Sequence, residues 1–183
     1  MGNVANVISG PAQLFVHADD GTIDPTTLTL TGAASDFSAF VSPGYTDKGI
    51  EFDYASTDKD IDVDELTSPV DVLITAEKLT LTVALAETTL QNLYYSISGG
   101  TLVSANELTI GGKVRPSRFI LGVLGPAPTT ALTREILIFR TVPKGTVKMH
   151  YQRKDKLVYT AQFQALGIST LPNGQNMCKI LDF

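Results

Sequence analysis

The chain has 183 residues, a net charge of −5 and a single cysteine, Cys178, which excludes an intrachain disulfide and a cysteine-based zinc site. This length predicts one domain over 1–183 with a substantial core, and the acidic balance argues against a protein-wide nucleic-acid surface. The start lacks the basic and long apolar regions of a signal peptide, and the most apolar run, 119–125, is too short to cross a bilayer. We therefore expect no export signal and no membrane insertion.

Most of the chain alternates apolar and polar residues, which is the pattern of a half-buried strand. The clearest example is 77–86, where four aliphatic residues alternate with lysine, threonine and alanine. In chain order, this pattern predicts strands at 13–17, 26–30, 49–54, 71–75, 77–86, 107–111, 118–124, 134–142, 146–153 and 157–166.

The segment 88–100 departs from this alternation and predicts a helix of about three turns. Its apolar residues recur at helical spacing, at Leu90, Leu93, Tyr94 and Ile97. Thr88 followed by Gln91 fits a capping box, and the glycine pair at the end can terminate the helix. We expect Leu90, Leu93 and Ile97 to be the core positions of this helix. A strand-rich chain with one amphipathic helix predicts a mainly β fold, a β-sandwich or barrel flanked by that helix.

The stretch 56–65, STDKDIDVDE, raises a separate question because aspartates occupy alternate positions. As a strand, it would have one face of carboxylates and one of aliphatic residues. The spacing does not fit a calcium loop, since counting from Asp58 or Asp60 gives neither glycine at position six nor glutamate at position twelve. The polar segment 55–69 is the candidate for a mobile loop. The candidate acidic surface comprises Asp58, Asp60, Asp62, Asp64 and Glu65.

Charge is distributed unevenly along the chain. The segment 47–71 holds nine acids against two bases, whereas 113–156 holds ten bases against two acids. Two such halves could meet across a contact between subunits. The candidate basic partner surface comprises Arg115, Arg118, Lys148, Arg153 and Lys154.

Residues for catalysis are scarce. The two histidines, His17 and His150, both lie on predicted strands without a surrounding motif. The glycine pairs do not match the spacing of a phosphate-binding loop, and Cys178 is most simply a packed side chain. We therefore expect no enzyme activity, no cofactor and no metal site.

The order of these features resembles the major tail tube proteins of long-tailed bacteriophages. The run 80–93, TLTVALAETTLQNL, matches the family's strand–helix junction, and an acidic segment precedes it. The strand-rich stretch REILIFRTVPKGTVKMHYQRKDKLVYTAQFQAL follows the junction, so that the resemblance covers most of 44–166.

The resemblance implies an orthogonal β-sandwich or barrel with a flanking helix. Its subunits would form hexameric rings that stack into a tube around a tape-measure protein, with tail terminator and tail-tip proteins at the ends. DNA would pass through the tube only in transit. The protein would be assembled in the host cytoplasm and end in the virion. The family's long loop, which joins subunits and successive rings, corresponds here to 41–75.

Two other functions stay open at this point. The tube protein of type VI secretion systems shares the expected fold, and a monomeric β-sandwich binding module has the same pattern of strands. The acidic residues of 56–65 could face a neighbouring subunit or line the bore of a tube. In either place their charge discourages edge-to-edge association of an exposed strand.

Overall fold

A computed structural model describes residues 10–64, 67–112, 115–128, 132–149 and 156–183. The fold is mainly β, with 49% strand and 7% helix, which confirms the predicted class of a β-sandwich with one flanking helix. Within these residues, one α-helix, α1 (Leu90–Ser96), and one short 3-10 helix, η2 (Ala34–Phe37), accompany the strands. The strands are β1 (Gln13–Ala18), β2 (Thr46–Ile61), β3 (Asp71–Leu85), β4 (Gly100–Ser104), β5 (Glu107–Ile110), β6 (Phe119–Pro126), β7 (Thr133–Lys144), β8 (Tyr159–Ala165) and β9 (Cys178–Asp182).

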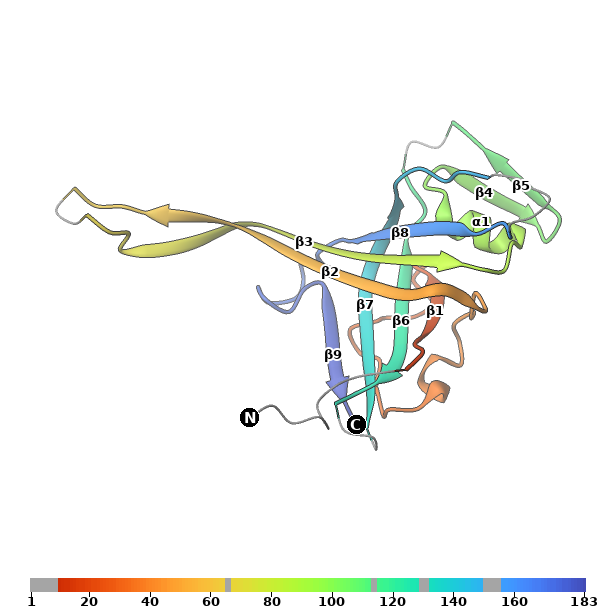
Figure 1. The fold of residues 1–183 in the computed structure, drawn as a ribbon, viewed down its shortest axis with the longest axis horizontal. Helices are drawn as coiled ribbons and strands as arrows, with labels where there is room; N and C mark the ends of the chain where they lie inside the picture. The colour runs from red at the N-terminus through yellow and green to blue at the C-terminus, as the bar shows by residue number, and fades with distance from the viewer. Residues whose placement is uncertain (1–9, 65–66, 113–114, 129–131, 150–155) are drawn as a thin grey trace.

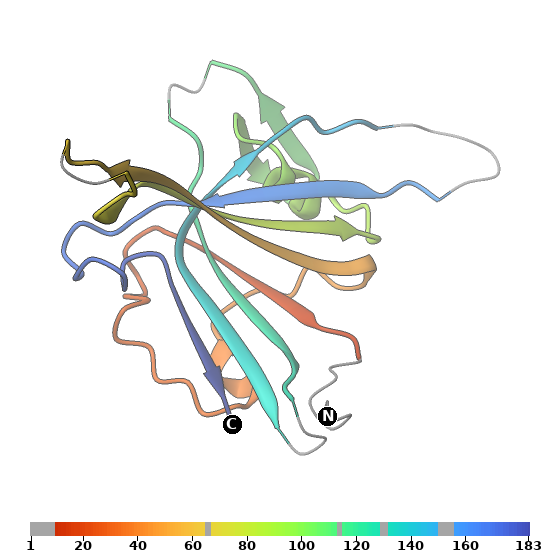
Figure 2. The ribbon, with the colours of Figure 1, turned by 60° about the vertical axis from the view of Figure 1, so that its left-hand side comes forward.

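The main sheet is antiparallel and has the strand order β1-β6-β7-β8-β3-β2. Strand β7 changes partner along its length, because its first half pairs with β9 and its last residues pair with β8. The sheet therefore divides at β7 into two halves whose strands cross steeply in space (Figures 1 and 2). A separate two-stranded sheet, β4-β5, lies beside α1.

The main core lies between the two halves of the sheet. It combines inward-facing side chains of β1 and β6 with those of β3 and β8, and α1 adds Leu93 and Tyr95. The Tyr95 and Phe119 rings meet edge to face at 5.3 Å, and Phe119 meets Phe163 in the same way at 6.3 Å. Such aromatic pairs add to the burial that holds the helix against the sheet.

A second core covers the outer face of β1, β6 and β7. The segment 19–41, here called the cover, lays Leu30, Phe37 and Phe40 on this face. Gly122 of β6 makes room for the ring of Phe37, since a Cβ at this position would overlap that ring. Both faces of these strands are thus buried, which explains their almost continuous apolar sequence.

Helix α1 is shorter than the sequence predicts. It begins after Thr89 rather than Thr88, and the Thr89 hydroxyl accepts the backbone N–H of Asn92 at 3.2 Å. It contains seven residues, about two turns, because Ile97 already has an extended backbone. Of the three predicted core positions, Leu93 is 5% exposed, whereas Leu90 and Ile97 are partly buried against the main core.

The predicted strands differ from the structure in five places. The strand at 26–30 is wrong, because Asp24 accepts hydrogen bonds from Thr26 and holds a turn there. Segments 71–75 and 77–86 form one continuous strand, β3, and the strands β4 and β9 were not anticipated. Residues 146–149 are not strand, and the remainder of the predicted 146–153 strand lies outside the described residues.

Candidate assembly surface

The acidic segment lies on a long two-stranded ribbon that projects from the body of the protein (Figure 1). We call residues 54–61 of β2 and 71–78 of β3 the arm. All sixteen of these residues are exposed. The sequence predicts a loop at 55–69, but residues 55–61 are strand. The described residues of the tip, 62–64 and 67–69, are turn, bend or irregular. At about 3.3 Å per residue, each of its strands extends roughly 26 Å.

In the described part of the chain, no further strand lies along either edge of the arm. Strand β3 pairs with β8 only from Thr80 to Leu85, and β2 is the last strand of the sheet. Among the described residues, the two arm strands therefore pair only with each other. A two-stranded ribbon of this kind is marginally stable in water by itself, and its open edges are templates for another chain.

The sequence of 56–65 alone predicts one carboxylate face and one aliphatic face, and the register of the arm adds aliphatic side chains of β3 to both faces. Residues opposite each other in an antiparallel pair share a face of the sheet. Asp58 lies opposite Ile74, and Asp60 lies opposite Val72. The other face likewise pairs Lys59 with Leu73, and Ile61 with Asp71. Each face of the arm thus carries charged and aliphatic side chains in alternation across the strands.

A β-bulge at Thr75 causes this mixing. Thr57 pairs with Ala76 and Asp58 with Ile74, so Thr75 is the extra residue on β3. Its hydroxyl donates to the carbonyl of Thr57 at 2.9 Å, which satisfies both groups locally. Because the bulge shifts β3 by one residue, Val72 and Ile74 share the face of the aspartates.

Aliphatic residues of the arm, together with Val70 directly before β3, are the functional candidates that the sequence reasoning missed. Val70, Val72, Leu73 and Ile74 are each 54–56% exposed in the subunit. The signal in the sequence is the unbroken run VLI at 72–74, which is typical of a strand buried on both faces rather than of a solvated ribbon. Exposed aliphatic clusters of this kind are typical of surfaces that bind another molecule.

The acidic candidates are spread over the arm and its tip. Asp58 and Asp60 are on β2, whereas Asp62 and Asp64 follow the end of the strand, and all four are exposed. Glu65 lies outside the described residues. The ion pairs found within the described part of the chain include none of these four aspartates. Near the base of the arm, Tyr54 donates a hydrogen bond to Glu77 at 2.5 Å, which raises the pKa of the tyrosine.

The basic half is partly neutralised within the subunit. Arg134 pairs with Asp182, and Arg140 pairs with Asp19, both at 2.6 Å. Lys156 reaches into the acidic half and pairs with Asp47 at 2.6 Å, which lowers the pKa of that carboxyl. Of the candidate partner residues, Arg115, Arg118 and Lys148 are exposed, and Arg153 and Lys154 lie outside the described residues.

The described residues hold no group of three or more histidine, cysteine or acidic side chains that could bind a metal. The ring of His17 hydrogen-bonds to the carbonyl of its neighbour Ala18 and lies tilted against the ring of Phe40. Cys178 packs against the main core, as expected, and burial raises the pKa of its thiol. Within the described chain, no helix is long and apolar enough to cross a membrane.

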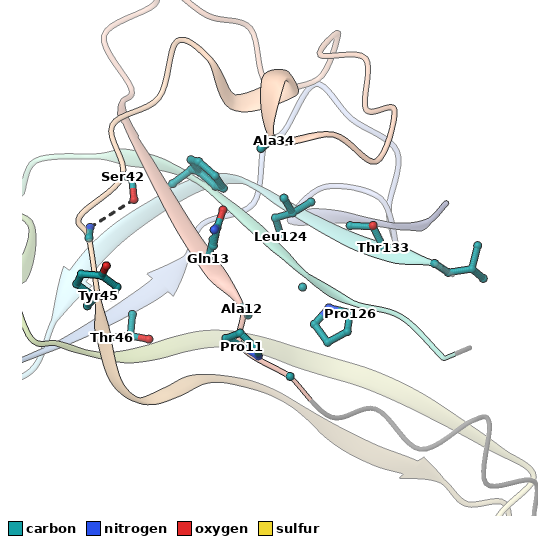
Figure 3. A pocket seen from close by; sticks show the side chains of 15 residues that line it. Pro11, Ala12, Gln13, Ala34, Ser42, Tyr45, Thr46, Leu124, Pro126 and Thr133 are labelled. Carbon is teal, nitrogen blue, oxygen red and sulfur yellow. Dashed lines mark hydrogen bonds between the residues drawn. The ribbon is translucent and has the colours of Figure 1, made fainter. Parts of the chain in front are cut away.

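A groove of about 930 Å³ opens where the two end strands of the sheet approach each other (Figure 3). It lies between the start of β1, the residues that lead into β2, and the end of β6. A binding pocket usually combines an apolar wall with a few converging polar groups. The described residues that line the groove are Gly10, Pro11, Ala12, Gln13, Phe15, Ala34, Ser42, Gly44, Tyr45, Thr46, Leu124, Gly125, Pro126, Leu132 and Thr133, none of which is charged.

The arm and the groove are thus two surface features of the described residues that could bind a partner or a ligand. Comparison with known proteins adds no third candidate and no residue roles. No protein-family model matches the sequence, and a search of curated proteins finds no relative.

Proposed function

We propose that the protein is a structural subunit that assembles with copies of itself through the arm. The observation that carries this proposal is the arm: an exposed two-stranded ribbon with open edges and aliphatic side chains on both faces. These features contribute little to an isolated subunit, but a neighbour could cover them. Such a contact joins the arm to a different surface of the next copy, and a head-to-tail contact of this kind generates rings or filaments.

Energetics favour the aliphatic residues as the main source of affinity. Complete burial of a valine, leucine or isoleucine side chain contributes about 1.5–3 kcal/mol, so covering the exposed half contributes roughly 1 kcal/mol. Four such residues lie at positions 70 and 72–74. An exposed ion pair contributes only about 0–1 kcal/mol. In this proposal the aspartates set orientation and salt dependence, and they keep free arms from pairing with each other.

The resemblance to tail tube proteins gives the proposal its finer form. Most of the arm, residues 54–61 and 71–75, falls within 41–75, where that family has its loop between subunits. The protein would then form stacked, hexameric rings of a phage tail tube, with a tape-measure protein inside and with terminator and tail-tip proteins at the ends. DNA would touch the tube only during ejection. A type VI secretion tube is the alternative within the same architecture.

A monomeric binding module is the second candidate, and the groove at the end of β1 is the observation that favours it. An arm-truncated variant separates the two functions. Replacing residues 57–76 with Asn-Gly joins Ser56 to Glu77, which lie opposite each other on β2 and β3, through a two-residue hairpin turn.

The truncated variant should fold with the wild-type melting temperature and remain monomeric at concentrations where the full chain assembles. Light scattering during a concentration series measures this difference. If the truncated variant assembles as readily as the full chain, the arm is not the assembly element. If both remain monomeric at every concentration, the binding module is the better description.

A further inference from the structure

A carboxylic acid lies within the second core. Glu135 of β7 is 0% exposed and is on the same face of the sheet as Leu137 and Phe139. Its partners across the strands are Leu124 of β6 and Leu181 of β9. Among the described residues, neither carboxyl oxygen of Glu135 has a hydrogen-bond partner. An ionised carboxylate in such a place is strongly destabilising, whereas a neutral acid is tolerated.

The cover brings a second acid against Glu135. Asp36 belongs to η2, and its carboxylate accepts the backbone N–H and the hydroxyl of Thr31. Partial burial acts to raise the pKa of Asp36, but these hydrogen bonds outweigh burial and keep it below the usual value. Asp36 is therefore ionised at neutral pH, and its charge repels a second negative charge on Glu135.

No cation of the neighbouring strands offsets these acids in the described structure. Arg134 precedes Glu135 on β7 and therefore points to the opposite face, where it binds Asp182 of β9 in a bidentate pair. The residues facing Glu135 from β6 and β9 are leucines. From the cover, Asp36 is the ionisable group that acts on Glu135.

We propose that Glu135 is a proton-operated latch for the cover: with the proton bound, the cover closes on the sheet, and loss of the proton releases it. A neutral Glu135 has an O–H that can donate to the Asp36 carboxylate. An ionised Glu135 leaves two like charges that repel each other in an apolar setting, and moving η2 away from the sheet lets water reach both.

The electrostatics place the loss of the Glu135 proton near neutral pH. Burial, which is the largest cause, and repulsion from Asp36 together raise the pKa of Glu135 to about 7. The backbone N–H of Gly32 opposes this shift without reaching hydrogen-bond geometry. In an open cover the same carboxyl would have its ordinary value of 4.5, so the latch tightens in acid and loosens in base.

Release of the cover would change the groove. Ala34, in η2, and Leu124, beside Glu135, both line the groove at the end of β1 (Figure 3). The Phe37 ring stacks on Phe15 at 5.0 Å, and Phe15 also lines the groove. A cover that opens with rising pH therefore moves one wall of this groove, whether or not the protein assembles through its arm.

Hydrogen exchange at pH 5.5 and pH 8.5, corrected for the intrinsic pH dependence of exchange, tests the latch. With a pKa of about 7 closed and 4.5 open, linkage predicts that the open population of the cover rises roughly thirtyfold between these pH values. Glu135→Gln, which keeps the shape and removes the titration, should abolish this rise. Glu107→Gln, which changes an exposed acid on β5, should behave as the wild type.

An equal rise in the wild type and Glu135→Gln, or no rise in the wild type, would overturn the proposal. If Glu135→Gln does not fold, carbon-detected NMR titration of the wild-type Glu135 carboxyl decides the question. A midpoint above pH 6 with slower exchange of the cover below it supports the latch. A midpoint at the ordinary value of a glutamate contradicts it.

Discussion

Replacing Val72 and Ile74 of β3 with threonine tests whether the aliphatic residues of the arm hold subunits together. Threonine remains branched at Cβ and suits a strand, so the change removes apolar surface while keeping the shape of the backbone. Val72 is 54% exposed and Ile74 is 56% exposed. Because such exposed substitutions usually change stability by less than about 0.5 kcal/mol, the subunit should melt at nearly the wild-type temperature.

The effect on assembly should be much larger. Covering the exposed half of each side chain contributes roughly 1 kcal/mol, taken as part of the 1.5–3 kcal/mol for complete burial. Losing both contributions weakens each contact by about 2 kcal/mol, which corresponds to a roughly thirtyfold higher concentration for assembly. Sedimentation velocity over a dilution series measures this concentration directly.

A matched control comes from the β4-β5 hairpin. Val103 and Ile110 are 58% and 61% exposed, so Val103→Thr with Ile110→Thr removes similar surface at a different place. This control should assemble at the wild-type concentration. The reasoning fails if the arm variant also assembles at that concentration, or if the control loses as much affinity as the arm variant.

Three further predictions follow from the fold and its charges. Leu93→Ala should lower the free energy of unfolding by about 2–5 kcal/mol in denaturant melts, because Leu93 is buried in the main core; an unchanged midpoint would contradict this. Changing Asp60, Asp62 and Asp64 to asparagine should raise the protein concentration needed for assembly by no more than roughly fivefold for each ion pair lost, and it should reduce the salt dependence of assembly. Unchanged assembly with an unchanged salt response would indicate that these aspartates line the bore of a tube instead. The free energy of unfolding should fall by about 3 kcal/mol as pH rises from 4.5 to 7, since folded Glu135 keeps a proton that the unfolded chain has lost, and Glu135→Gln should remove this contribution.

The fold class could be predicted because strong local patterns agree with the tertiary contacts. The alternation at Leu79, Leu81, Val83 and Leu85 matches four side chains that are each at most 1% exposed. The helix was found in the right place but one turn too long. Its capping residue is the second of two threonines, a choice that local sequence does not distinguish.

The arm could not be predicted from local pattern. A polar segment usually predicts a loop, but β3 continues unbroken from the core into the arm and supplies a partner for 55–61. The position of the bulge at Thr75 then decides which side chains share a face, and that choice depends on pairing across the ribbon. The same limit applies to Glu135, whose burial depends on a cover about one hundred residues earlier in the chain.

The size of the purified wild-type protein as a function of its concentration is the most direct test of the central claim. We predict particles that grow with protein concentration and that appear as rings or tubes by electron microscopy. They should form at a lower protein concentration when the ionic strength is low, because salt screens the charged contacts. A protein that sediments as a monomer across the whole range, with the arm intact, would contradict self-assembly.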